Sequence, residues 1–154
     1  MSDVPVEEYL CTRIRRAEQA LMGHHEAVLR DYGLTMTQYT VLLTLSRDGD
    51  LSGAQLARAC GVTQQTMAGV LTGLQNKSLI DRQPSPVHAK VLIASLTTGG
   101  QDLLDRAYQE VIVLERALTE RFTSEEVKEF CDFLDRATAT LVEQTPRPSA
   151  ASPV

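Results

Sequence analysis

The segment from residue 51 to residue 97 constrains the fold most, because its apolar spacing changes there from a helical period to a strand period. Helical spacing predicts three short helices, at 36–46, 53–60 and 64–77. Two short apolar runs, Leu79–Arg82 and Val91–Leu96, then flank a proline-bearing tip at 84–89, which indicates a β-hairpin. Three short helices followed by a hairpin predict a winged helix-turn-helix. A generic helical bundle with an incidental hairpin is the alternative.

Longer helices are expected on both sides of this lobe. Apolar residues at alternating spacings of four and three predict a helix over 6–32, and similar stripes predict one helix after Thr98 and another over 124–143. The expected fold class is mainly α with a small β-hairpin wing. We predict a helical dimerisation region at 6–32 and 98–143, a winged helix-turn-helix DNA-binding lobe at 35–97, and a disordered tail at 144–154.

The charge of the chain is unevenly distributed. The net charge of the 154 residues is −5, which argues against a general nucleic-acid-coating protein. Residues 47–97 nevertheless carry five basic and three acidic side chains, so an anionic partner is expected to dock there. The sequence has no apolar run long enough to span a bilayer, and its acidic start lacks a signal-peptide pattern. We therefore expect a cytoplasmic protein.

The third short helix has an unusual outward face. At 100° per residue, Met67, Val70, Leu71 and Leu74 share one side. The opposite side and its flanks hold uncharged residues, namely Gln64, Gln65, Thr66, Ala68, Gly69, Thr72 and Asn76. Amides can pair with adenine, threonine and alanine can meet a thymine methyl group, and small residues permit close approach to a groove. This pattern favours base recognition in DNA, and the alternative is an ordinary polar surface.

Contacts to DNA phosphates are then expected from other positions. Candidates are the helix N-termini capped by Ser52, Thr63 and either Thr35 or Thr37, together with the cations Arg58, Lys77, Arg82 and Lys90. So few cations predict modest affinity for each subunit.

Three stretches of the chain resemble the MarR family of bacterial transcription regulators. They are LTMTQYTVLLTL at 34–45, the segment from LSGAQL to LIDR at 51–82, and SLTTGGQDLL at 95–104. The resemblance extends over roughly residues 8–142. It implies a homodimer whose first and last two helices interlock, winged lobes on a pseudo-palindromic double-stranded DNA operator, and control by a small aromatic or phenolic effector or by cysteine oxidation. No membrane partner is implied.

The predicted wing tip departs from the family's pattern. The family typically has an aspartate and, two residues later, an arginine that enters the minor groove. Here His88 and Lys90 stand at those two places. Lysine keeps the charge but lacks the planar fork of arginine, so the resemblance implies a weaker contact or one to phosphate alone.

An effector site is expected along the first long helix. Arg15 and Arg16 offer guanidinium groups, His24 and His25 offer imidazoles, and Tyr39 of the next helix completes the predicted set. A cation beside apolar surface suits an aromatic carboxylate. The alternative is that the arginines are solvated or paired with Glu18 and its neighbours, and that the histidines only pack.

Cys11 is the alternative switch. Its place in YLCTRI resembles that of the reactive cysteine in the organic-hydroperoxide-sensing branch of the family, and Arg15 one turn later would favour thiolate. Glu7 and Glu8 oppose this effect, and the tyrosines of that branch are replaced here by Arg15 and His25. The alternative is that Cys11 only packs, and the same packing role is expected for Cys60 and Cys131.

No enzyme motif is found in the sequence. It lacks a glycine-rich phosphate loop, paired carboxylates in an apolar setting and metal-ligand spacing, so we expect no catalytic residue, no metal and no cofactor. The remaining hypotheses are a DNA-binding repressor released by a small aromatic ligand, a repressor switched by Cys11, and a dimeric interaction module that has lost DNA binding.

Overall fold

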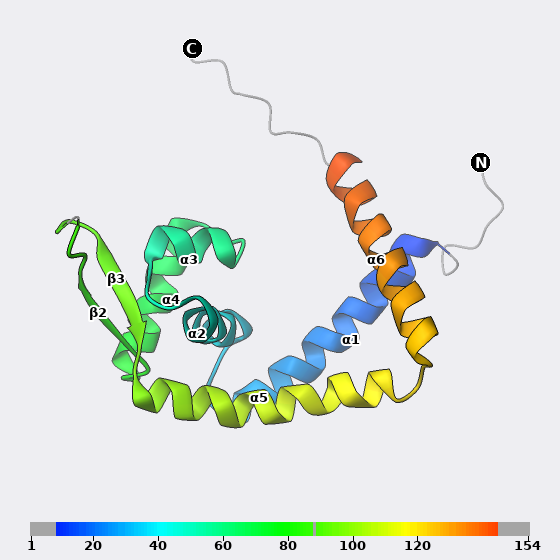
Figure 1. Cartoon of the computed structure of the whole chain (residues 1–154), viewed down its shortest axis with the longest axis horizontal. Coiled ribbons are helices and arrows are strands. Elements are labelled where there is room, and N and C mark those ends of the chain that lie inside the picture. The colour runs from blue at the N-terminus through cyan, green and yellow to red at the C-terminus, as the bar shows by residue number, and fades with distance from the viewer. Residues whose placement is uncertain (1–8, 88, 145–154) are drawn as a thin grey trace, which may run out of the picture. The chain divides into compact units, whose positions relative to one another are not determined.

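The computed structural model describes residues 9–87 and 89–144 of the chain. Their elements in chain order are α1 (Leu10–Asp31), α2 (Met36–Asp48), β1 (Leu51–Ser52), α3 (Gly53–Ala59), α4 (Gln64–Asn76), β2 (Ile80–Pro84), β3 (Leu92–Leu96), α5 (Thr98–Thr119) and α6 (Ser124–Gln144). Figure 1 labels each of them except the two-residue strand β1. The chain forms two compact units that divide within α5, after Val111. None of the described helices is long and apolar enough to cross a membrane.

Local sequence sets where the short helices begin. The Thr35 hydroxyl accepts the Gln38 N–H, and the Gln38 side chain accepts the Thr35 N–H, both at 3.2 Å, which is a capping box at the start of α2. Ser52 and Gln55 form the same arrangement at the start of α3. At α4 the Thr63 hydroxyl accepts the backbone N–H of the third helical residue at 3.1 Å. The predicted caps Ser52 and Thr63 are confirmed.

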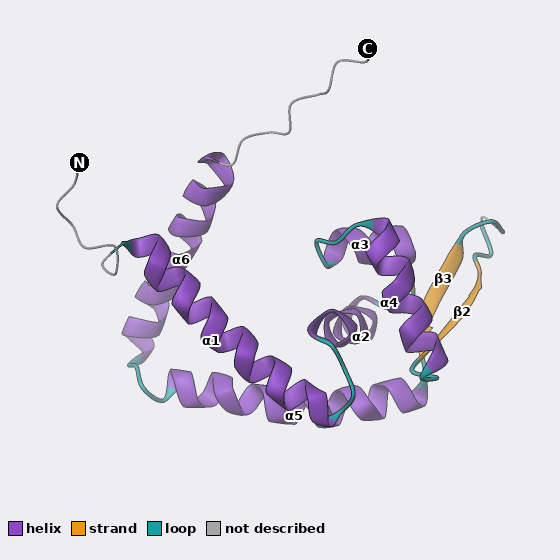
Figure 2. Ribbon diagram, turned by 180° about the vertical axis from the view of Figure 1, so that it is seen from behind, coloured by secondary structure: helices purple, strands orange, loops and turns teal. Residues whose placement is uncertain are grey.

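The wing is a three-stranded antiparallel sheet with the order β1-β3-β2, as Figure 2 shows for its two longer strands. Arg82 of β2 lies opposite Ala94 of β3, and Leu51 of β1 pairs with the same residue from the other side. The hairpin was predicted, but the two-residue strand β1 was not. Two residues carry no readable alternation, and only pairing with β3 makes them a strand.

The hydrophobic core of the first unit lies among the three short helices, the sheet and the ends of α1 and α5. Its fully buried side chains include Leu29, Val41, Leu42, Leu56, Met67, Leu71, Leu74 and Ile80. Thr44 is the buried polar residue of this core, and its hydroxyl donates to the Thr40 carbonyl at 2.8 Å. That bond satisfies the hydroxyl inside its own helix, so Thr44 is tolerated there.

The start of α5 is held closely against the end of the α4–β2 connection. The Gly100 N–H donates to the Thr97 hydroxyl at 2.9 Å, and the same hydroxyl donates to the Ser78 carbonyl at 2.9 Å. A Cβ added to Gly100 would lie 2.0 Å from the Leu79 carbonyl oxygen. Glycine is therefore required at this point of the TTGGQ motif, because any side chain would meet backbone.

The second unit, described over residues 112–144, has almost no core of its own. Thr123 and Glu126 form a capping box at the start of α6. No residue of α6 is buried, although the helix carries an apolar stripe. Phe122 stacks on Phe130 with ring centroids 6.2 Å apart, and both rings are about half exposed.

Several expected boundaries move. Helix α1 begins at Leu10, and residues 6–8 of the predicted helix lie outside the described residues. Helix α2 continues two residues beyond the predicted end, and its cap is Thr35; Thr37 lies inside the helix, so its prediction as a cap is wrong. Gln144 still belongs to α6, and the rest of the predicted tail lies outside the described residues.

Candidate nucleic-acid interface

Helix α4 separates its apolar and polar residues as the sequence predicts. Met67, Leu71 and Leu74 are at most 1% exposed, and Val70 is half-buried. The residues predicted to contact bases are all exposed; they are Gln64, Gln65, Thr66, Ala68, Gly69, Thr72 and Asn76. Burial of one side against the core therefore leaves the uncharged side of α4 open to a partner.

The polar groups on this face differ in how free they are. The Thr72 hydroxyl donates to the Ala68 carbonyl at 2.9 Å, and the Thr66 hydroxyl lies 2.9 Å from that of Thr63. Among the described residues, the side-chain amides of Gln64, Gln65 and Asn76 have no hydrogen-bond partner. Each of these amides keeps both donor and acceptor available, which is what bidentate recognition of adenine requires.

Gly69 leaves the middle of this face without a side chain. A Cβ added there would have no heavy atom within 4 Å. The fold itself therefore does not need glycine at this position, in contrast to Gly100. Because Gly69 has no side chain, the helix backbone can approach a DNA groove more closely at this position.

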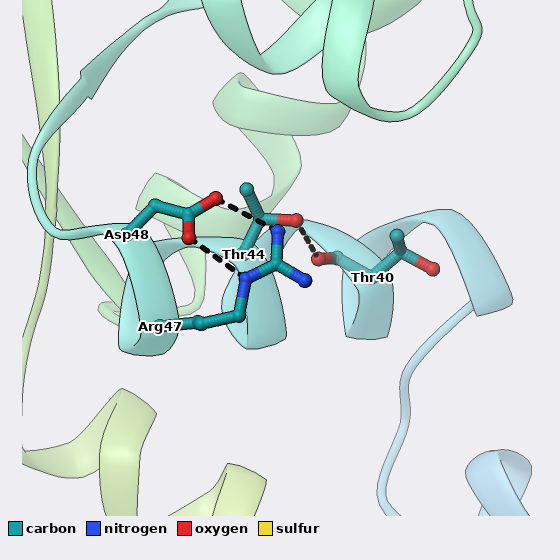
Figure 3. A network of polar contacts seen from close by, with 4 residues as sticks. All are labelled: Thr40, Thr44, Arg47 and Asp48. Carbon is teal, nitrogen blue, oxygen red and sulfur yellow. Dashed lines mark hydrogen bonds and ion pairs between the residues drawn. The ribbon is translucent and has the colours of Figure 1, made fainter.

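One cation of the middle segment is already paired. The Arg47 guanidinium contacts the Asp48 carboxylate through Nε at 2.7 Å and through Nη2 at 2.8 Å, at the end of α2 (Figure 3). This hydrogen-bonded pairing holds the pKa of the Asp48 carboxyl below its ordinary value. Arg47 is therefore neutralised locally and adds little to the positive charge of the lobe.

The four predicted phosphate-contacting cations lie in different surroundings. Arg58 is exposed on α3, Arg82 is half-buried on β2, and Lys90 is exposed in the turn between β2 and β3. Lys77 follows α4, and its ammonium donates to the Gly33 carbonyl and, at 3.0 Å, to Gln38 Oε1. No local sequence pattern indicates these two partners, because they lie 44 and 39 residues away.

The wing tip exposes apolar side chains. Val87 is 78% exposed, and Val91 and Leu92 are each about two-fifths exposed. The Ser85 N–H donates to the Val91 carbonyl at 2.7 Å and closes the loop. His88 lies outside the described residues, so its predicted role stays a prediction.

The predicted effector residues of α1 do not converge within one chain. Arg15 and Arg16 are exposed, whereas His24 and His25 are half-buried. Arg15 and His24 are nine residues apart, which places them on opposite sides of the helix and about 13.5 Å apart along its axis. One small ligand held by a single α1 therefore cannot contact both of them.

The two histidines share an unusual environment. Their rings meet edge to face with centroids 6.1 Å apart, and His24 Nε2 and His25 Nδ1 are buried without a hydrogen-bond partner among the described residues. Burial, and to a lesser degree the neighbouring His24, lower the pKa of His25. Buried polar atoms without partners are rare, so both nitrogens lack the hydrogen bond that such atoms ordinarily form.

Tyr39 and the cysteines also have defined positions. Tyr39 is 4% exposed, and its burial, together with Tyr108, raises the pKa of its phenol. Cys11 and Cys131 are exposed. Cys60 packs against the core; burial raises the pKa of its thiol, and a hydrogen bond with Thr44 opposes only part of that rise. Within the described residues, no cluster of three or more His, Cys, Asp or Glu side chains is arranged to hold a metal ion.

Comparisons with known proteins agree with this arrangement. A sequence model of the MarR family matches residues 32–90. The chain is 34% identical over 121 residues to an HTH-type transcriptional repressor of Mycobacterium tuberculosis, an alignment that covers 79% of this chain and 87% of that protein.

Two solved structures have a similar fold. One is Bordetella bronchiseptica BpsR, whose DNA binding is regulated by 6-hydroxynicotinic acid; the TM-score is 0.78 at 20% identity, with 89% of this chain and 98% of that one covered. The other is the repressor CouR of Rhodococcus jostii bound to a 23-mer DNA duplex, with a TM-score of 0.76 at 23% identity and coverage of 89% and 99%.

Proposed function

Because this chain belongs to the MarR family and is a DNA-binding transcriptional repressor of that type, we propose that it acts as a homodimer on a pseudo-palindromic operator and is released by a small aromatic or phenolic ligand. The uncharged, exposed face of α4 carries the DNA-reading part of this proposal. A solvated helix face normally carries Glu and Lys, whereas this one offers free amides, hydroxyls and a glycine. Members of this family and the curated relatives are transcriptional regulators rather than enzymes.

Gln64, Gln65 and Asn76 are the proposed base-reading amides, and their chemistry favours adenine. Ala68 and Gly69 would admit the helix deep into the major groove. The N-termini of α3 and α4 would bind phosphates, with Arg58, Arg82 and Lys90 as the cationic contacts. Lys90 would approach the minor groove from the wing as a point charge, together with the exposed apolar tip.

The proposed homodimer rests on apolar surface that a single chain leaves uncovered. In the second unit, exposed apolar side chains lie on α5, on α6 and in the turn between them; they are Val113, Leu118, Phe122, Phe130, Phe133, Leu134 and Val142. In the first unit, Leu10 and Leu21 of α1 are 66% and 40% exposed. A helix that buries no residue although it carries an apolar stripe, as α6 does, normally packs against another surface, so a second copy is the proposed cover.

The proposed effector contacts are His24 and His25. Their unpartnered buried nitrogens can donate to or accept from a carboxylate, phenol or ring nitrogen, and the surrounding helix supplies apolar surface. Release of DNA requires only that the ligand bind more tightly to a dimer whose DNA-binding lobes are wrongly spaced for the operator than to a dimer whose lobes fit it. Control of BpsR by a hydroxylated aromatic acid supports this class of ligand.

DNA binding is tested by fluorescence anisotropy with duplexes taken from the DNA upstream of the gene that encodes this chain. The affinity is measured across a series of salt concentrations and compared with that for a scrambled duplex. We expect specific binding, with an association constant whose logarithm falls linearly with the logarithm of the salt concentration. Gln65→Ala should lose specific affinity, and Gln109→Ala, an exposed amide on α5, should not. Absence of binding both to this DNA and to a random-operator pool would favour the interaction module over the repressor.

Ligand control is tested with a panel of hydroxylated aromatic carboxylic acids, 6-hydroxynicotinic acid among them, added to the protein–DNA complex. His24→Gln should blunt ligand-induced release and keep DNA affinity. Arg15→Ala, exposed on the opposite side of α1, is the matched control and should keep both. The reverse pattern would move the effector site to the arginine side of the helix.

Oxidation of Cys11 is the second candidate, favoured by the exposure of its thiol. A hydroperoxide would transfer one oxygen atom to this thiol, giving a sulfenic acid and an alcohol. Cys11→Ser would then abolish peroxide-induced release from DNA, while Cys131→Ser, also exposed, would not. Unchanged release in the Cys11 variant would exclude this switch.

A further inference from the structure

We infer that Lys77 is a positioning residue for the DNA-reading helix, rather than a phosphate contact. It ties the C-terminal end of α4 to the junction between α1 and α2. This inference rests on the proposed DNA binding and adds a residue that acts on DNA affinity through α4.

The contacts of Lys77 carry the inference. Its ammonium donates to the Gly33 carbonyl, directly after α1, and to Gln38 Oε1 in the first turn of α2. The backbone N–H of Lys77 itself donates to the Gly73 carbonyl at 3.3 Å and ends α4. One side chain therefore joins the end of α4 to the end of α1 and the start of α2, which lie 44 and 39 residues earlier in the chain.

Gln38 is held from two further sides, so it forms a fixed acceptor. Its Oε1 also accepts the Thr35 N–H at 3.2 Å as part of the α2 capping box. A Cβ added to Gly73 would lie 3.1 Å from Gln38 Nε2. The absence of a side chain at Gly73 thus allows the Gln38 amide to pack directly on α4, next to the Lys77 contact.

This geometry predicts how Lys77 affects DNA binding. Two of its three N–H donors are engaged by protein acceptors at the exposed surface, so the ammonium can offer a phosphate only its third N–H unless those bonds break. The bonds fix α4 relative to α2 and to the end of α1, which carries the proposed effector contacts. Loss of the bonds would lower the fraction of molecules whose α4 is aligned for the groove, and apparent affinity would fall by that fraction.

The decisive experiment compares Lys77→Met with Lys90→Met, each in the full-length chain, by anisotropy across a salt series. Methionine keeps an apolar stem and removes the ammonium in both variants. Lys90 is a proposed phosphate contact. Lys90→Met should therefore reduce the slope of the logarithm of the association constant against the logarithm of the salt concentration by about one for each subunit bound. Lys77→Met should keep the wild-type slope and weaken specific binding roughly three- to tenfold at every salt concentration.

Stoichiometric titration at high protein concentration separates positioning from simple loss of folded protein. Lys77→Met should retain the full active fraction. A reduced slope for this variant, an unchanged affinity, or a loss explained wholly by a smaller active fraction would each overturn the inference.

A double-mutant cycle with Gln38→Ala tests the partner. We expect Lys77→Met to cost less in the Gln38→Ala background than in the wild type, because one of its acceptors is already gone. Additive losses would contradict the assignment.

Hydrogen exchange without DNA gives a readout that does not depend on the proposed function. In Lys77→Met the backbone N–H groups of residues 33–38 should exchange faster than in wild type, and those of β2 and β3 should not. If the variant exchanges residues 33–38 at the wild-type rate, Lys77 does not hold α4 against the α1–α2 junction, and the inference is overturned even if DNA binding is confirmed. If the wild type fails to bind DNA, the proposed function fails, but this local test of the Lys77 contacts still applies.

Discussion

Replacing Gly100 by alanine should destabilise the protein, although alanine is the better helix former. The added Cβ would lie 2.0 Å from the Leu79 carbonyl oxygen and 2.9 Å from Leu96 Cδ1. Relief of the backbone contact requires the start of α5 to move away by about 1 Å, since a carbon–oxygen contact needs at least about 3 Å. The Leu79 carbonyl also accepts the Thr97 N–H at 3.2 Å, and this movement would weaken that bond.

The size of the effect follows from these competing contributions. Overpacking against a closely packed site costs about 1–3 kcal/mol, and a weakened hydrogen bond costs about 1 kcal/mol more. Helix propensity returns at most about 1 kcal/mol. We therefore expect a net loss of about 1–3 kcal/mol, which for a chain of this length lowers the melting temperature by roughly 2–12 °C.

Gly99→Ala is the matched control, one residue earlier in the same helix. Its Cβ would meet only the Thr97 hydroxyl, at 3.9 Å. It should raise stability by up to about 1 kcal/mol through helix propensity alone. Urea and thermal unfolding, at one fixed protein concentration because a dimer's stability depends on it, give the comparison. A Gly100→Ala protein as stable as Gly99→Ala would refute the argument from close approach.

Three further predictions concern the DNA-reading face, the buried histidine and the thiols. Gly69→Ala should stabilise the protein by up to about 1 kcal/mol in urea unfolding yet weaken specific DNA binding, and unchanged affinity would show that close approach is not needed there. Because the pKa of His25 is lowered in the folded state, stability should fall as pH drops below about 6.5, and His25→Gln should lose less between pH 7.5 and 5.5; equal losses would contradict this. Under native conditions Cys11 and Cys131 should be alkylated before Cys60, as followed by mass spectrometry; early labelling of Cys60 would show that its site opens.

Features that depend on near neighbours in sequence were predictable. The caps Ser52 and Thr63 act on N–H groups three residues away, so the local pattern contains both partners. The two faces of α4 followed from helical spacing, because Met67, Leu71 and Leu74 recur on one side and a helix buries its apolar side.

Other features depended on contacts between distant segments. Strand β1 exists only because Leu51 pairs with Ala94 and Ser52 pairs with Ile93, more than 40 residues later.

The sequence by itself determined the helix and strand types, the capped helix starts and the chemistry of the outward face of α4, because these are properties of period and of near neighbours. The tertiary structure decided which of these groups remain free to contact a partner and which are engaged within the protein. Lys77 reads in sequence as one of four free cations, but the packing of α4 against the α1–α2 junction places its ammonium on the Gly33 carbonyl. Gly69 and Gly100 read alike, yet only Gly100 faces a backbone carbonyl. Such differences arise from segments brought together by burial of the shared core, and no local pattern records them.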